Sequence, residues 1–211
     1  MLYEVYEDEP QTDRAPPSVI DIRMSRDGGR SGSPPTRVTS LQLPGLPIPG
    51  TRLRVRGGDG MQAAIDPRRG TIYLVWERKT SGVPGIALAA SRDGGLHWSI
   101  RRRIGPKSRA AAFLPNIAIN DSGDVAVSYY AFRPNHPGLT DYRIIVSRNA
   151  GRTFGAGRRL DSFNILQAPK SYGGYFVGDY EGLASEGRNF IAFWSRSVPG
   201  KTSVRSVQVT P

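Results

Sequence analysis

Short runs of alternating hydrophobic and polar residues recur along the whole chain. Such alternation is typical of β-strands that bury one face, and no apolar period of 3.6 residues, the mark of a helix, persists anywhere. The runs are separated by stretches rich in glycine, proline, asparagine and aspartate, which favour tight turns. The pattern therefore predicts an all-β protein built from many short strands.

We expect fourteen strands in four groups of three, four, four and three. Within one group the strands are joined by short turns, as in antiparallel sheets. The segments 44–50 and 164–176 are expected to be connectors, the first being too rich in proline for a central strand. The predicted strands are 2–6, 18–24 and 36–43; 61–66, 71–76, 85–90 and 99–104; 114–119, 124–130, 142–147 and 156–160; and 178–184, 189–194 and 202–209.

One turn sequence recurs in three of the groups. A serine is followed by aspartate or asparagine, by glycine, and by an aromatic residue. The short polar side chain can accept hydrogen bonds from its own turn, and the glycine permits positive φ, so the motif indicates a rigid hairpin turn. The copies are Ser91, Asp93, Gly95 and Trp98; Ser147, Asn149, Gly151 and Phe154; and Ser25, Asp27 and Gly29, with Gly32 where the aromatic residue would fall.

The spacing S-x-D-x-G-x-x-W, repeated at blade-like intervals, resembles the Asp-box (BNR) repeats of sialidase-like β-propellers. The resemblance implies four-stranded antiparallel blades, six of them in a complete propeller, with each box between the third and fourth strands. It also places the boxes on the rim away from the active site. The resemblance thus implies a fold for nearly the whole chain and assigns no catalytic residue.

Fourteen strands make about three and a half four-stranded blades. We interpret residues 1–211 as a single propeller domain or a fragment of one, with blade parts at about 1–43, 61–104, 113–163 and 178–209. The first group starts at the second strand of a blade, so about two blades are expected to be missing from this chain. An incomplete ring would leave strand edges open, through which copies of the chain could associate.

Candidate catalytic residues lie near the start of the last group, in the segment 178–183. In the sialidase-like fold, the resemblance implies an active face where inner strands begin and where second strands lead into third strands. Asp179, Tyr180 and Glu181 lie in such a place. Tyr180 and Glu181 are adjacent and would point to opposite faces of a strand, so they could pair as nucleophile and base only if the strand has not yet begun, whereas Asp179 and Glu181 share a side. These two carboxylates could serve as acid and base or as calcium ligands, or could simply line the channel.

Three arginines are candidates for holding an anionic sugar. Arg78 and Arg196 each follow two residues after a tryptophan at the end of a predicted second strand, and Arg133 is near the equivalent place. Three guanidinium groups on one face could bind a carboxylate bidentately. Because arginine is frequent in this chain, chance placement in polar loops is the alternative interpretation.

The chain is strongly basic, with 29 Lys and Arg against 18 Asp and Glu and a net charge of +11. Basic residues are spread along it, and the runs 101–103 and 158–159 fall on expected outer strands, where charge blocks edge-to-edge pairing. No nucleic-acid-binding motif is present, so we do not favour a nucleic-acid partner. The chain has no cysteine and no apolar run long enough for a membrane span. The acidic start is not a signal peptide, which indicates a cytoplasmic protein unless an export signal has been lost.

Two functions follow as hypotheses. The first is a glycan-binding protein or glycoside hydrolase acting on anionic sugars, with sialic acid suggested by the resemblance alone. The second is a non-catalytic propeller that serves as a platform for protein interactions. Convergence of Arg78, Arg133 and Arg196 on Asp179 and Glu181 in one pocket would favour the first, and divergence would favour the second.

Overall fold

The computed structural model describes residues 1–8, 18–41, 45–56, 60–80, 82–106, 110–178 and 181–211. In these ranges the chain is almost entirely β-structure, with one turn of 3-10 helix, η1 (Ile165–Gln167), and no helix long and apolar enough to span a membrane. The strands are β1 (Leu2–Asp8), β2 (Val19–Ser25), β3 (Thr36–Ser40), β4 (Leu46–Pro47), β5 (Arg54–Val55), β6 (Met61–Ile65), β7 (Ile72–Thr80), β8 (Val83–Ser91), β9 (Ser99–Ile104), β10 (Ala112–Ile119), β11 (Val125–Phe132), β12 (Leu139–Ser147), β13 (Arg158–Asn164), β14 (Lys170–Ser171), β15 (Gly174–Tyr175), β16 (Gly182–Glu186), β17 (Asn189–Val198) and β18 (Lys201–Val209).

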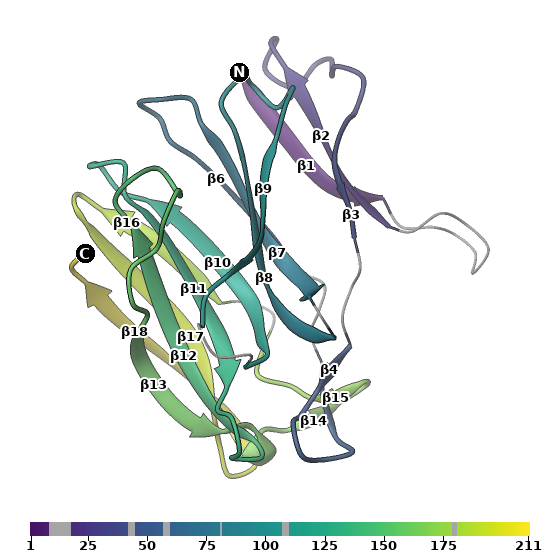
Figure 1. Ribbon diagram of the computed structural model, residues 1–211, viewed down its shortest axis with the longest axis vertical. Coiled ribbons are helices and arrows are strands. Elements are labelled where there is room, and N and C mark those ends of the chain that lie inside the picture. The colour runs from purple at the N-terminus through teal and green to yellow at the C-terminus, as the bar shows by residue number, and fades with distance from the viewer. Residues whose placement is uncertain (9–17, 42–44, 57–59, 81, 107–109, 179–180) are drawn as a thin grey trace.

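Four large antiparallel sheets follow one another in chain order (Figure 1). The first contains β1–β3, the second β6–β9, the third β10–β13 and the fourth β16–β18, each with its strands in sequence order. Their sizes are three, four, four and three strands, as the alternation predicts. Several strands are longer than expected, because regular pairing continues beyond the last residue of the apolar run.

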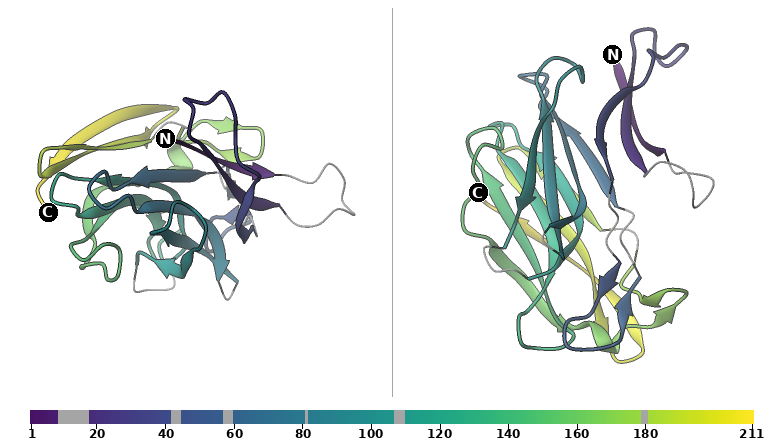
Figure 2. Two further views of the ribbon diagram at one scale, coloured as in Figure 1. Left: turned by 90° about the horizontal axis from the view of Figure 1, so that it is seen from above. Right: turned by 45° about the vertical axis from the view of Figure 1, so that its right-hand side comes forward.

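The sheets pack face to face (Figure 2). Each interface has its own hydrophobic core. Leu74 and Trp76 of β7 pack against the first sheet, whereas Tyr73 and Val75 pack against the third. Strands of the second and third sheets are therefore buried on both faces, which explains why they are apolar almost throughout. The innermost strand of the third sheet, β10, contacts both β6 and β16.

The three serine-containing turns share one hydrogen-bond pattern and connect β2 to β3, β8 to β9, and β12 to β13. In the clearest, the Ser91 hydroxyl accepts a bond of 2.9 Å from the Gly95 N–H, and Asp93 Oδ1 accepts one of 2.9 Å from the His97 N–H. The indole of Trp98 donates to the Gly95 carbonyl at 3.0 Å and closes the turn. Gly95 has φ of 93°, a conformation that glycine adopts without strain. Asn149 and Asp27 accept equivalent bonds, so all three turns do the structural work that the motif predicts.

A fifth, small sheet corrects the expectation that residues 44–50 and 164–176 are plain connectors. Its strand order is β14-β15-β5-β4, with β15 parallel to β5. Pro47 is tolerated because β4 is an edge strand and needs no donor on its outer side. The small sheet ties the segment after the first sheet to the loop that precedes the fourth.

Candidate functional site

A buried carboxylate lies beside the innermost strand of the third sheet. Glu77, on β7, is 1% exposed, and its Oε1 accepts a hydrogen bond of 2.8 Å from the Leu114 N–H. β10 starts two residues before its predicted start, and Leu114 lies inside it at a β-bulge with φ of 48°. Positive φ is unusual for leucine, so the bond to Glu77 helps to hold a strained backbone. Sequence reasoning missed Glu77, whose signal is a single charge at the end of the apolar run 71–76.

A second carboxylate, Glu181, lies directly before β16 on the other side of β10. Its Oε1 is 3.2 Å from the Tyr130 hydroxyl, which also lies 2.7 Å from the Ser195 carbonyl and accepts a bond of 3.1 Å from the Ser195 N–H. Burial raises the pKa of Tyr130 well above its usual value, and the negative charge of Glu181 raises it further. Tyr130 is therefore neutral, and its one hydroxyl proton lies between the Ser195 carbonyl and the half-buried Glu181; sequence reasoning missed this contact.

Asp179 and Tyr180, the other catalytic candidates, lie outside the described residues. Within the described ranges, no group of three or more His, Asp or Glu side chains could hold a metal ion. The calcium interpretation, which needs Asp179 beside Glu181, therefore stays a prediction.

The structure does not bring the three candidate arginines together. Regular pairing along β7 puts Arg78 on the same face as Trp76, toward the first sheet. On β17, Arg196 lies toward the third sheet, with its Nη1 3.4 Å from Asp161 Oδ1. Arg133 follows β11 and lines a pocket that faces the second sheet, and its Nη2 donates at 2.7 Å to Asp141 of β12 in its own sheet. Each arginine thus faces the preceding sheet, and the three occupy three successive interfaces.

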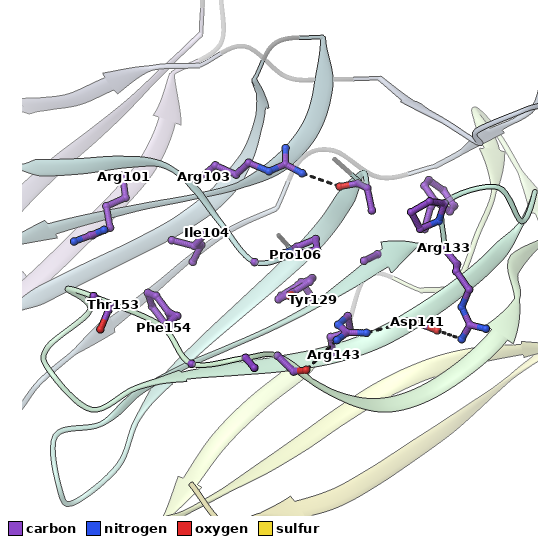
Figure 3. Close-up of a pocket in the computed structure, with 18 residues that line it drawn as sticks. Arg101, Arg103, Ile104, Pro106, Tyr129, Arg133, Asp141, Arg143, Thr153 and Phe154 are labelled. Carbon is purple, nitrogen blue, oxygen red and sulfur yellow. Dashed lines mark hydrogen bonds and ion pairs between the residues drawn. The ribbon is translucent and has the colours of Figure 1, made fainter. Parts of the chain in front are cut away.

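A pocket of about 490 Å³ opens between the second and third sheets around Arg133 (Figure 3). Four arginines and one aspartate are its charged residues, and we call it the arginine groove. Asp141 binds Arg133 at 2.7 Å and Arg143 at 3.3 Å, and Arg143 also donates to the Gly157 carbonyl at 2.9 Å. The remaining lining arginines are Arg101 and Arg103, which belong to the outer strand β9.

Comparison with known proteins gives structural matches only: no model of a protein family matches, and no curated protein sequence does. A Hadza microbial sialidase, Hz136, superimposes with a TM-score of 0.62 at 15% identity, over 97% of this chain and 41% of the sialidase. The α-L-arabinanase of Penicillium chrysogenum, complexed with arabinobiose, superimposes with a TM-score of 0.56 at 14% identity, over 97% of this chain and 57% of the arabinanase. The GH93 α-L-arabinofuranosidase of Fusarium graminearum superimposes with a TM-score of 0.52 at 15% identity, over 71% of this chain and 44% of the arabinofuranosidase.

This chain has the fold of a sialidase-like β-propeller. The prediction of an all-β partial propeller is confirmed, and the four large sheets are its blades. The chain spans less than two thirds of the length of each of these enzymes. In propeller terms, β6, β10 and β16 are the inner strands, and Glu77 and Glu181 flank the inner strand of the third blade.

Proposed function

We propose that the chain is part of a sialidase-like Asp-box propeller that binds glycans on the face where its inner strands begin. The hydrogen bond from Tyr130 to Glu181 carries the proposal, because it fixes a carboxylate at the start of the inner strand β16. A fixed carboxylate can accept hydrogen bonds from sugar hydroxyls, and it can also act as a general acid or base. The fold shared with sialidase and arabinanase structures supports a carbohydrate ligand as an analogy.

Hydrolysis would require a second carboxylate, and Asp179 is our candidate for it. In the sequence Asp179 precedes Glu181 by two residues, just before β16. Because β16 begins only at Gly182, strand alternation does not exclude Tyr180 as a partner of Glu181, and a Tyr180 nucleophile with Glu181 as its base is the alternative for hydrolysis. We assign no joint carboxylate clamp to Arg78, Arg133 and Arg196, since they occupy separate interfaces.

The second candidate function is a non-catalytic interaction platform. It is favoured by two ion pairs: Arg133 binds Asp141 within the third blade, and Arg196 binds Asp161 between the third and fourth blades, so both arginines stabilise the fold. Under this interpretation the carboxylates Glu77 and Glu181 only stabilise the backbone around β10.

The test compares the unmodified chain with Glu181→Gln and with a matched control, Glu186→Gln, an exposed glutamate at the far end of β16. Binding of arabinobiose and of 3′-sialyllactose is measured by isothermal titration calorimetry. We expect one of the two sugars to bind the unmodified chain. Its affinity for Glu181→Gln should be at least tenfold weaker, equivalent to about 1.4 kcal/mol, and its affinity for Glu186→Gln should be unchanged. Equal affinity of all three proteins for the sugar, or binding of neither sugar, would favour the platform.

A further inference from the structure

The arginine groove is a separate site with an excess of positive charge. The charged residues that line it are four arginines, Arg101, Arg103, Arg133 and Arg143, and a single carboxylate, Asp141. It lies between the outer part of the second blade and the third blade, and neither Glu77 nor Glu181 lines it.

Several guanidinium donors in the groove have no acceptor among the described residues. Arg101 is exposed and makes no hydrogen bond or ion pair there. Arg133 uses only Nη2, which binds Asp141 and Ser162, so its Nε and Nη1 remain available, and its side chain is 31% exposed. Among the described residues the guanidinium fork of Arg101 is unoccupied and can bind a planar carboxylate bidentately, whereas both forks of Arg133 include the occupied Nη2, so its Nη1 can donate to one carboxylate oxygen.

Between these cations the groove presents ring surfaces and a buried hydroxyl. Figure 3 shows Arg101 and Arg133 at opposite ends, with Phe154 and Tyr129 between them. The Tyr129 hydroxyl lies beside the Arg143 guanidinium. Burial raises the pKa of Tyr129 to about 12, which the positive charge of nearby Arg143 opposes, so the hydroxyl is a neutral donor.

We propose that the arginine groove binds a short oligosaccharide of uronic acid units. Such a chain alternates sugar rings, whose C–H faces pack on aromatic and proline surfaces, with carboxylates that can accept hydrogen bonds from the guanidinium groups of Arg101 and Arg133 at the two ends. The volume of about 490 Å³ lies within the range of small-ligand sites, roughly 300–1,000 Å³. Non-specific binding of single-stranded nucleic acid uses a longer basic track with a series of stacking rings, which the described lining does not offer.

Titration with tri-galacturonic acid at low salt tests the proposal on the intact chain. Arg101→Gln removes a charge that has no structural partner, and Arg205→Gln removes an equally exposed charge from β18, in the fourth blade. We expect Arg101→Gln to weaken binding about tenfold and Arg205→Gln to change it less than twofold. Arg133→Lys keeps a cation next to Asp141 but has no second nitrogen to donate to a sugar carboxylate, and should also weaken binding severalfold.

Glu181→Gln should leave the affinity for tri-galacturonic acid unchanged, so the groove and the inner-strand site can fail independently. The proposal is overturned if the unmodified chain does not bind this sugar, or if Arg101→Gln and Arg205→Gln weaken binding equally, which would indicate a general charge effect. Tighter binding of hexaglutamate would assign the groove to an acidic peptide, and tighter binding of a ten-residue oligothymidylate would assign it to nucleic acid.

Discussion

Replacement of Asp161 by alanine tests how the third and fourth blades are held together. Asp161, on β13, accepts a hydrogen bond of 2.9 Å from the Trp194 indole and lies 3.4 Å from the Arg196 guanidinium, both on β17. Its side chain is 14% exposed. The same interface brings Tyr130 against Glu181, so its integrity underlies the proposed glycan site.

The expected loss of stability follows from the two interactions. A hydrogen bond to a charged group is worth about 1.5–3 kcal/mol, and the ion pair, with Arg196 29% exposed, adds about 0–1 kcal/mol after solvent screening. Together the loss is about 2–4 kcal/mol, which for a chain of this size lowers Tm by roughly 4–15 °C.

The assay is thermal unfolding at pH 7, followed by circular dichroism. Asp161→Asn keeps an acceptor for Trp194, so its free energy of unfolding should fall about half as much as that of Asp161→Ala. Asp121→Ala, at an exposed turn, is the control and should shift Tm by less than about 2 °C. If Asp161→Ala also shifts Tm by less than about 2 °C, these bonds do not hold the two blades together.

Two further predictions concern a turn and the small sheet. Hydrogen bonds from His97 lower the pKa of Asp93 to about 2, below its ordinary 3.8, so its stabilising effect is present above about pH 4 and is lost as pH falls toward 2. Between pH 5 and pH 2.5 the Tm of Asp93→Asn should therefore fall less than the Tm of the unmodified chain. An equal fall in Tm would show that ionised Asp93 does not stabilise the turn. Gly174→Ala places a methyl group against the Arg54 carbonyl at a φ of 145°, which should cost about 2–4 kcal/mol in urea unfolding; a change below about 0.5 kcal/mol would show that the small sheet does not constrain this backbone.

The four large sheets could be predicted because their signals are local. Alternation over five to nine residues and a repeated turn such as the one at Ser91–Trp98 depend only on neighbours in sequence. The small sheet could not, since its strands are two residues long and β5 pairs with β15, which is distant in sequence. Two residues carry no periodicity, so only the assembled tertiary structure specifies that pairing.

The candidate site was less predictable for a geometric reason. Arg78 and Arg196 occupy equivalent positions on the second and fourth blades, and equivalent positions are related by rotation about the propeller axis. Only side chains near the propeller axis converge. Both arginines lie on second strands, which are one strand farther from the axis than the inner strands. Glu181 was identified from its place before an inner strand, but its donor Tyr130 comes from another blade and has no sequence signal of its own.

The most direct test of the central claim is to map a bound glycan by backbone amide chemical shifts in the labelled chain, using whichever of arabinobiose and 3′-sialyllactose binds. We predict that the largest shifts fall on Glu181, Gly182 and Ser195, and that Glu181→Gln removes them. Shifts confined to the rim turns, or unchanged shifts in Glu181→Gln, would contradict a glycan site at the start of the inner strands.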